Sequence, residues 1–500
     1  MPSNRDLAQF LYHALCRGDA VDKAVLTAQL LTVLACSLPL SAVAAQNRHH
    51  TPQVAAASAQ SMTTSRARES LPSAQRTVEL TLTAEPTRLS LLPGATTEVF
   101  AYNGSIPGPT LEVREGDRVI VHFKNNLPEP TTVHWHGLHI PFASDGSPFH
   151  PVAPGKQHDY VFTIKHGAAG TYWYHPHPGH RTGYQVAKGL YGAIIVRAAD
   201  DPLPASLQEK LLILSDNRFQ PDGSIDRAHS HSTQAHVDRE NGREGNVLFV
   251  NGHVMPTLTI RSGEVQRWRV VNASAARVYR LALSGHAFLH VGNDGGLFER
   301  PVEVKEILIA NGERVELLVR GSGPPGARSV LQTLPYDRYI PQTRPTDWNV
   351  PRDLLTLQYT DETPAAPVEL PRTLRSIPVL DTAEATATRL MVLTQGFING
   401  KAMDMGRVDI SAKVGATEIW EIENLVGMDH PFHLHGFQFQ VLDRNGVAEP
   451  FRSWKDLLNV PKHETARFIV RYDDYAGKWM FHCHILDHEE QGMMGILEVK

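Results

Sequence analysis

An Asn-Gly pair recurs in the sequence at residues 103, 251 and 399, so that both intervals between the pairs are 148 residues. A similar segment follows each pair: PGPTLEVREGDRVIVHFKNN, then VMPTLTIRSGEVQRWRVVN, then KAMDMGRVDISAKVGATEIWEIEN. A similar segment that returns at a fixed period indicates structural units of one kind in tandem. The chain of 500 residues has the length for three domains of about 150 residues each. The repeat therefore predicts three equivalent domains.

Within each unit, apolar and polar residues alternate, as in RVIVHF at 118–123 and EIWEI at 418–422. Gly, Pro or Asn breaks the alternation about every eight to twelve residues, a spacing that is typical of antiparallel strands in a β-sandwich. We predict an all-β protein with three Greek-key β-sandwich domains in tandem. The predicted domains span residues 78–200, 205–365 and 375–500.

The start of the chain resembles an export signal. The segment KAVLTAQLLTVLACSLPLSAVAA at 23–45 places a basic residue before an apolar run, which small residues follow. We predict that residues 1–45 are removed on export, so that the protein is periplasmic or secreted. An uncleaved membrane anchor and a lipid anchor at Cys36 are the alternatives. Residues 46–77 are rich in Ser, Thr, Ala and Gln, which predicts a flexible tether.

The charge of the chain limits its partners. A net charge of -5 supplies no basic field for nucleic acid. Beyond the export segment, no stretch is long and apolar enough to cross a bilayer, so we expect no stable membrane insertion after processing. We expect a monomer whose partners are small molecules.

Histidines are frequent, with 26 in the chain, and histidine is the commonest protein ligand for metals. Four H-x-H pairs lie in TVHWHG, WYHPH, HPFHLHG and FHCH; their histidines are His134, His136, His175, His177, His433, His435, His482 and His484. The first two pairs belong to the first repeat and the last two to the third. A single H-x-H pair usually marks a solvated strand, but four pairs around one cysteine indicate a metal centre.

Strand geometry divides these residues between two sites. In a strand, residues two apart point the same way and neighbours point oppositely. His482 and His484 therefore face one side of their strand, while Cys483 faces the other. The same reasoning separates His430 from the pair His433 and His435. We predict that one short strand serves two metal sites.

The chemistry of the ligands indicates copper. A thiolate, two imidazoles and a weak thioether describe a blue-copper electron-transfer site. Cys483, His430, His488 and Met493 supply that set, and the other two cysteines, Cys16 and Cys36, lie in the export segment. Zinc is disfavoured because the chain has no C-x-x-C motif. The eight histidines of the four pairs suit a multinuclear copper centre between the first and third repeats.

Together, HWHG, YHPH, HPFHLHG and HCHILDHEEQGMM resemble the motifs of the multicopper oxidases, and the resemblance covers nearly the whole chain after the tether. DGG at 294–296 and FINGKAMDM at 397–405 are similar to the three-domain bacterial laccase and copper efflux oxidase branch. The resemblance implies cupredoxin-like domains and four coppers. His430, Cys483, His488 and Met493 would bind type 1 copper, and His134 and His433 type 2. The type 3 pair would have the ligands His136, His175, His177, His435, His482 and His484.

The reaction implied by the resemblance is the one-electron oxidation of a small reducing substrate, coupled to the four-electron reduction of dioxygen to water. That reduction consumes protons, and buried carboxylates can hold and release them near neutral pH. Asp145 and Glu489 match the acidic positions that assist proton delivery in the family. We predict this role for both residues.

The substrate is less restricted by the sequence. The methionine-rich segment of a dedicated copper efflux oxidase is absent, since Met391 is the only methionine in residues 350–392. We therefore expect phenolic or aromatic amine substrates, with oxidation of cuprous or other metal ions, or of bilirubin, as alternatives. A copper nitrite reductase and a copper-free cupredoxin-like binding protein are more distant. The first has two domains and lacks four H-x-H pairs, and the second would have lost ligands.

Overall fold

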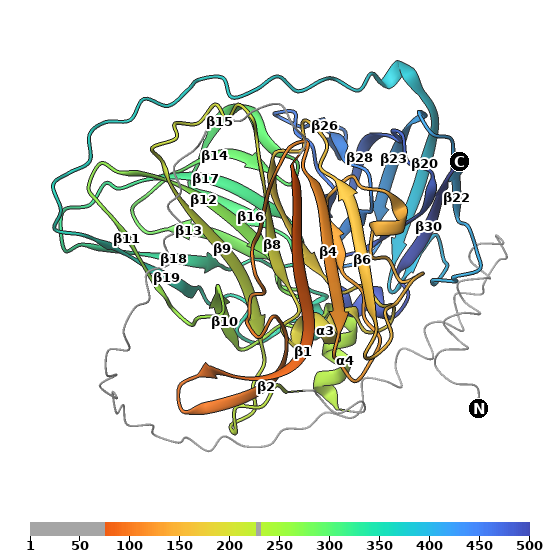
Figure 1. Cartoon of the computed structure of the whole chain (residues 1–500), viewed down its shortest axis with the longest axis horizontal. Coiled ribbons are helices and arrows are strands. Elements are labelled where there is room, and N and C mark those ends of the chain that lie inside the picture. Colours follow the sequence, from red (N-terminus) through yellow and green to blue (C-terminus); the bar gives the residue numbers. More distant parts are fainter. Residues whose placement is uncertain (1–75, 227–231) are drawn as a thin grey trace, which may run out of the picture. The chain divides into compact units, whose positions relative to one another are not determined.

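The computed structural model describes residues 76–226 and 232–500. The predicted export segment 1–45 with Cys16 and Cys36, and the predicted tether as far as residue 75, lie outside the described residues. Strands predominate in the described part and form six sheets (Figure 1), which confirms the predicted all-β class.

The first group of strands forms two four-stranded sheets, in the orders β2-β1-β4-β6 and β3-β8-β7-β5. The bounds are β1 (Thr77–Leu92), β2 (Ala95–Tyr102), β3 (Leu111–Arg114), β4 (Arg118–Asn125), β5 (His134–His136), β6 (Gln157–Thr163), β7 (Gly170–His175) and β8 (Gly192–Arg197).

The second group forms a six-stranded sheet, β10-β9-β12-β17-β14-β15, and a five-stranded sheet, β11-β19-β18-β13-β16. The bounds are β9 (Gln208–Asn217), β10 (Val247–Val250), β11 (Thr257–Ile260), β12 (Val265–Asn272), β13 (Tyr279–Leu283), β14 (Phe288–Asn293), β15 (Gly296–Val304), β16 (Glu306–Ile309), β17 (Arg314–Arg320), β18 (Arg328–Leu334) and β19 (Arg352–Tyr359).

The third group repeats the strand order of the second, as β21-β20-β23-β28-β25-β26 and β22-β30-β29-β24-β27. The bounds are β20 (Ala385–Thr394), β21 (Phe397–Ile398), β22 (Ile410–Ala412), β23 (Thr417–Asn424), β24 (His430–Leu434), β25 (Phe439–Arg444), β26 (Val447–Ala448), β27 (Leu457–Val460), β28 (Thr465–Arg471), β29 (Gly477–Cys483) and β30 (Met494–Val499). The predicted domain boundaries themselves stay predictions.

The three Asn-Gly pairs form the same turn. Asn103, Asn251 and Asn399 have φ of 50°, 53° and 51°, and the glycine after each also has positive φ, as a tight hairpin turn requires. Each Asn side chain also bonds the backbone of the strand that opens its group, as Asn103 does with the N–H of Thr83 and the carbonyl of Thr81. The period of 148 residues in the sequence is therefore a period in the structure.

Most strand pairs are antiparallel, as predicted, but each of the six sheets also contains one parallel pair: β1 with β4, β3 with β8, β9 with β12, β11 with β19, β20 with β23, and β22 with β30. After the β1–β2 hairpin, the chain crosses to the other sheet as β3 and returns as β4 beside β1. Such a crossover leaves two neighbouring strands running in one direction. Alternation in a sequence shows that a segment is a strand but not which way it runs.

Each group of strands encloses its own apolar core. Val121 and Phe123 are buried in the first core, Trp268 in the second, and Trp420 and Phe432 in the third. Burial of this apolar surface is the main stabilising contribution to each sandwich.

Helices are few and short in the described part of the chain. They are α3 (Thr182–Ala187), α4 (Thr233–Asn241) and α5 (Leu486–Glu490), with 3-10 turns η1 (Phe142–Ser144), η2 (Pro341–Thr343) and η3 (Thr382–Glu384). None of the helices in residues 76–226 and 232–500 has the length and apolar character that a membrane crossing needs.

Candidate metal centre

The four H-x-H pairs lie on two pairs of neighbouring strands. In the first group, β5 pairs with β7 so that His134 lies opposite His175. In the third group, β24 pairs with β29 so that His433 lies opposite His482. His435 and His484 follow directly after the ends of β24 and β29, and His177 lies two residues beyond the end of β7. The register of each strand pair therefore gathers the histidines at one place on its sheet.

The eight histidines form one buried cluster to which both groups of strands contribute. Three sets each bring their ligand atoms within 4.8 Å of one another: His134 with His433 and His435, His134 with His136 and His175, and His177 with His435 and His482. The ring of His484 lies 5.0 Å from that of His136 and 5.7 Å from that of His175. All eight side chains are buried.

Several ring nitrogens of this cluster lack partners among the described residues. His134 Nε2, His136 Nδ1, His175 Nε2, His433 Nε2 and His484 Nε2 are buried and make no hydrogen bond there. His482 Nε2 faces two other ring nitrogens, at 3.3 Å from His177 Nε2 and 3.1 Å from His435 Nε2. An unsatisfied buried polar atom costs about 1–3 kcal/mol. Metal ions would satisfy these atoms, so the residues present fit a multinuclear metal centre.

Burial favours the neutral form of several cluster histidines, which is the form that binds metals. Desolvation, with repulsion between the rings, lowers the pKa of His136, His175, His177, His433, His435 and His484 well below the ordinary value. The pKa of His482 falls to about 4, again mainly through burial.

A second set of possible ligands lies on the other face of β29. His430, Cys483 and His488 bring one ligand atom each within 4.8 Å of one another, and all three are buried. The thiol of Cys483 is free, and burial raises its pKa to about 12. A metal ion must therefore displace the thiol proton when it binds there.

The structure also distinguishes the two neighbouring methionines. Met493 is fully buried in the same apolar cluster as Cys483, and its backbone bonds those of Cys483 and His488. Met494 packs instead against Met480 and Ile496. This placement supports Met493 as the thioether beside Cys483.

Asp145, a predicted proton carrier, lies directly against the cluster. Its backbone carbonyl accepts a hydrogen bond from His134 Nδ1 at 2.8 Å, and its Oδ2 accepts one from His435 Nδ1 at 3.0 Å. Hydrogen bonds of this kind fix which ring nitrogen is left for a metal.

Glu489, the other predicted proton carrier, is fully buried on the far side of His177. Its Oε1 accepts a hydrogen bond from Thr182 at 3.0 Å and lies 3.6 Å from His177 Nδ1. Burial, and next the nearby Glu490, raise the pKa of Glu489 well above its usual range. The side chain is therefore suited to carry a proton at neutral pH.

Two features of the site were missed in the sequence. Asp456 accepts a hydrogen bond from His136 Nε2 at 2.9 Å through Oδ1, and its backbone carbonyl accepts one from His433 Nδ1 at 2.7 Å. Asp456 and His136 are 320 residues apart, and no motif of the single sequence links them.

The other missed feature is α4, which covers His488. The Nε2 atom of His488 donates to the carbonyl of Glu240 at 3.1 Å, and the side chain of His488 is 1% exposed. Gln395 and Gln491 also donate to carbonyls in the last turn of α4, at 3.2 and 3.1 Å. The last turn of a helix has free carbonyls, and the side chains around His488 satisfy them here.

Known proteins share this architecture. Family models described as multicopper oxidase match residues 83–201, 220–331 and 373–500. The multicopper oxidase mco of Staphylococcus aureus is 33% identical over 435 residues, which cover 84% of this chain and 88% of that protein. The laccase of Bacillus subtilis (strain 168) is 28% identical over 470 residues, with 81% and 90% covered.

Solved structures agree with the family models. A multicopper oxidase from Campylobacter jejuni, described as a metallo-oxidase, has a TM-score of 0.77 and 34% identity, with 86% of this chain and 93% of that chain covered. A laccase from Pediococcus acidilactici has a TM-score of 0.75 and 33% identity, with 85% and 90% covered. Because the matched segments extend over all three groups of strands, and because both groups of metal-ligand residues lie within them, the chain belongs to the multicopper oxidase family.

Proposed function

We propose that this protein oxidises small one-electron donors and reduces dioxygen to water with four copper ions. The family binds copper, and the histidine cluster of this chain carries the proposal. His134 and His433 would hold type 2 copper, and His136, His175, His177, His435, His482 and His484 the type 3 pair. His430, Cys483, His488 and Met493 would hold type 1 copper.

The strand β29 supports this division into two sites. Cys483 faces His430 and His488, while its neighbour His482 faces His177 and His435 on the other side of the strand. Copper, when bound, supplies the one-electron chemistry at both sites. The backbone of residues 482–484 supplies a short covalent route between them, so a donor that gives one electron near His488 need not approach the oxygen site.

We assign proton delivery to Asp145 and Glu489. Asp145 bonds His435, and Glu489 lies beside His177, so each carboxylate reaches a different histidine of the cluster. The two residues orient the rings and hold a proton near the place where dioxygen is reduced.

Phenols or aromatic amines are our first candidate donors, as for the laccases that this chain resembles. Metal ions are the second candidate, because His488 is buried under α4 and no bulky donor can touch its ring while α4 stays in place. The resemblance to a structure described as a metallo-oxidase agrees with this candidate. Bilirubin is a third candidate donor. A nitrite reductase or a copper-free binding protein fits the buried, unpartnered nitrogens less well.

Export to the periplasm or medium, with loss of residues 1–45, and a monomeric state complete the proposal.

Metal analysis and the visible spectrum of the copper-loaded protein test the sites, and oxygen uptake with a panel of phenols, bilirubin and Cu(I) tests the donor. We expect four coppers per chain and an intense blue absorption. Fewer than three coppers, or uptake of oxygen with none of these donors, would contradict the proposal.

A further inference from the structure

Two aspartates hold the histidine cluster in matching ways. The backbone carbonyl of Asp145 binds His134 of its own group of strands, and its carboxylate binds His435 of the third group. The backbone carbonyl of Asp456 binds His433 of its own group, and its carboxylate binds His136 of the first group. The pairs of rings match as well, because His134 stacks on His435 and His136 stacks on His433, both with centroids 3.9 Å apart. Asp456 is thus the counterpart of Asp145 across the cluster.

Asp456 makes a contact that has no counterpart at Asp145 among the described residues. Arg314, at the start of β17 in the second group, binds both carboxylate oxygens of Asp456, with Nη1 at 2.8 Å from Oδ1. Arg314 is fully buried and is itself bound by the backbone carbonyls of Thr171 and Gly312, at 3.0 Å each. Its Nη1 also lies 3.6 Å from Asp294 Oδ1. A planar guanidinium that binds both oxygens fixes the orientation of a carboxylate. The group of strands that has no H-x-H pair therefore orients Asp456.

The glycine of the HWHG motif makes room for this ion pair. Gly137 has a φ of +86°, and a Cβ atom there would lie 2.4 Å from Asp456 Oδ2 and 2.5 Å from Arg314 Nη2. No side chain at residue 137 is compatible with the pair.

The ion pair decides which nitrogen of His136 is available. Because the carboxylate of Asp456 can only accept, His136 Nε2 must donate to it, and Nδ1 is left with its lone pair. His136 Nδ1 and His177 Nδ1 are buried nitrogens without a partner, whereas His134, His175, His433 and His484 each leave Nε2 free. Asp456 could be taken for a metal ligand itself, since it lies with His136 and His433. Its two oxygens, however, are already bound by Arg314 and His136.

We propose that Asp456 and Arg314 are positioning residues of the cluster, which fix the orientation of the His136 ring. The inference rests on the proposed copper cluster. A partner of this kind typically changes metal affinity by about 10- to 100-fold.

Copper retention tests the proposal. Asp456→Asn keeps the shape of the side chain but removes its charge and puts an amino group in place of one oxygen, so Arg314 loses the bond to that oxygen and the side chain is no longer fixed by the ion pair. Arg314→Met removes the cation. Both copper-loaded variants should lose cluster copper at chelator concentrations about 10- to 100-fold lower than the wild type and keep the blue absorption that reports Cys483.

Glu316→Gln is the matched control. Glu316 lies on the same strand, is equally buried and pairs with Arg267 and Arg269 instead of a cluster residue. This variant should lose stability yet retain cluster copper as the wild type does. If Asp456→Asn retains copper as well as Glu316→Gln does, the positioning role is wrong. If the wild type itself holds no cluster copper, the proposed function fails, and the inference fails with it.

A second measurement uses the wild-type protein and so does not depend on whether a variant folds. Nitrogen-15 NMR of the full-length copper-free protein, labelled at histidine, reports which ring nitrogen of His136 carries the proton. We expect the proton on Nε2, and a proton on Nδ1 would overturn the inference.

Discussion

Cys483 lies on the strand that the two proposed copper sites share, and its side chain belongs to only one of them. It faces His430 and His488, while the histidines on either side of it face the cluster. Cys483→Ser should abolish the blue absorption and the oxidation of donors, because serine supplies no thiolate. Metal analysis should still find copper in the cluster, since no cluster histidine is changed. A Cys483→Ser protein that stays blue would disprove the assignment of this residue.

Asp145 and Glu489 differ from Cys483 in that their loss should leave the spectrum intact. Asp145→Asn and Glu489→Gln should keep four coppers and the blue colour, yet slow the reoxidation of the reduced protein by dioxygen. The reason is that an amide keeps most of the shape of a carboxyl group but carries no exchangeable acid proton. Stopped-flow reoxidation between pH 4 and 8 measures the effect. Wild-type rates across this range in both variants would show that the residues are only structural.

The candidate ligands could be predicted from the sequence, but the residues that orient them could not. Strand parity around Cys483 follows from a period of two residues, which a single sequence displays. The contacts of Asp456 with His136 and Arg314 join residues 320 and 142 positions apart. Only the packing of three groups of strands brings them together, and one sequence holds no signal of it.

Helix α4 covers His488, and we expect it to decide which donors reach that side chain. Gln395 and Gln491 hold its last turn, and hydrogen bonds of this kind contribute about 0.5–1.5 kcal/mol each. The double variant Gln395→Ala/Gln491→Ala should therefore populate an open form more, by about 5- to 150-fold. We expect this variant to raise kcat/KM for a bulky phenol by a much larger factor than kcat/KM for a small metal ion.

Gln234→Ala is a suitable control for α4. Gln234 lies on the exposed side of the helix, and its side chain donates a hydrogen bond to Asp238 at 2.9 Å. Equal changes in kcat/KM for phenol and metal ion would argue against a selective barrier.

The sequence did not predict α4, because Thr233–Asn241 has almost no apolar periodicity and only Ala235 and Asn241 are buried. By contrast, the alternating strands were evident.

At the end of α5, Glu490 should make stability depend on pH. Burial raises its pKa to about 7, whereas an unfolded chain has a value of about 4.3. The stabilisation of the folded state by the proton on Glu490 is fully present below about pH 4. It is lost as the pH rises through 7, at up to about 1.4 kcal/mol per pH unit. Glu490→Gln keeps an oxygen for the N–H of Tyr184, which Glu490 binds at 2.9 Å. The variant should match the wild type at pH 4 and exceed its free energy of unfolding at pH 8.

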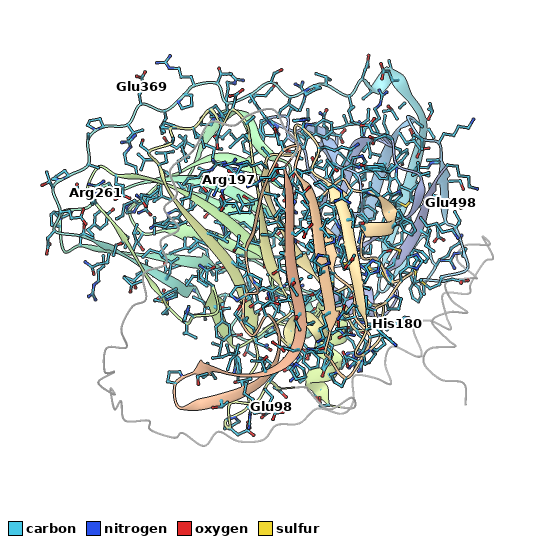
Figure 2. All side chains as sticks on the ribbon, in the orientation of Figure 1. Glu98, His180, Arg197, Arg261, Glu369 and Glu498 are labelled. Carbon is cyan, nitrogen blue, oxygen red and sulfur yellow. The ribbon has the colours of Figure 1, made fainter. Side chains whose placement is uncertain are left out.

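Urea unfolding of the copper-free protein at several pH values checks this prediction. Glu98→Gln is the control, because Glu98 is an exposed carboxylate (Figure 2) with a side chain that is 76% accessible. A pH profile of Glu490→Gln that parallels that of the wild type would contradict the assignment.

Across the whole molecule, the cluster joins the two ends of the described chain. Its ligands come from β5 and β7 near one end and from β24 and β29 near the other. A ligand that binds only the folded state at 1,000 times its Kd stabilises that state by about 4 kcal/mol. Copper should therefore raise the Tm of the protein, and Cys483→Ser should keep most of the rise while His433→Ala loses it. Calorimetry with and without copper measures both, and an equal rise in the two variants would speak against the cluster as the link.

The space at Gly137 also has a consequence for how such sequences vary. The HWHG motif ends in glycine because Arg314 and Asp456 occupy the volume of a side chain there. Each of Gly137, Arg314 and Asp456 therefore limits the size of the side chains at the other two positions, although the three are far apart in the sequence. Among relatives, a residue with a Cβ at the position of Gly137 should be found only where one of the other two positions has become smaller. The fourth letter of the motif is then correlated with residues far along the chain, and the inheritance of the three positions should be coupled.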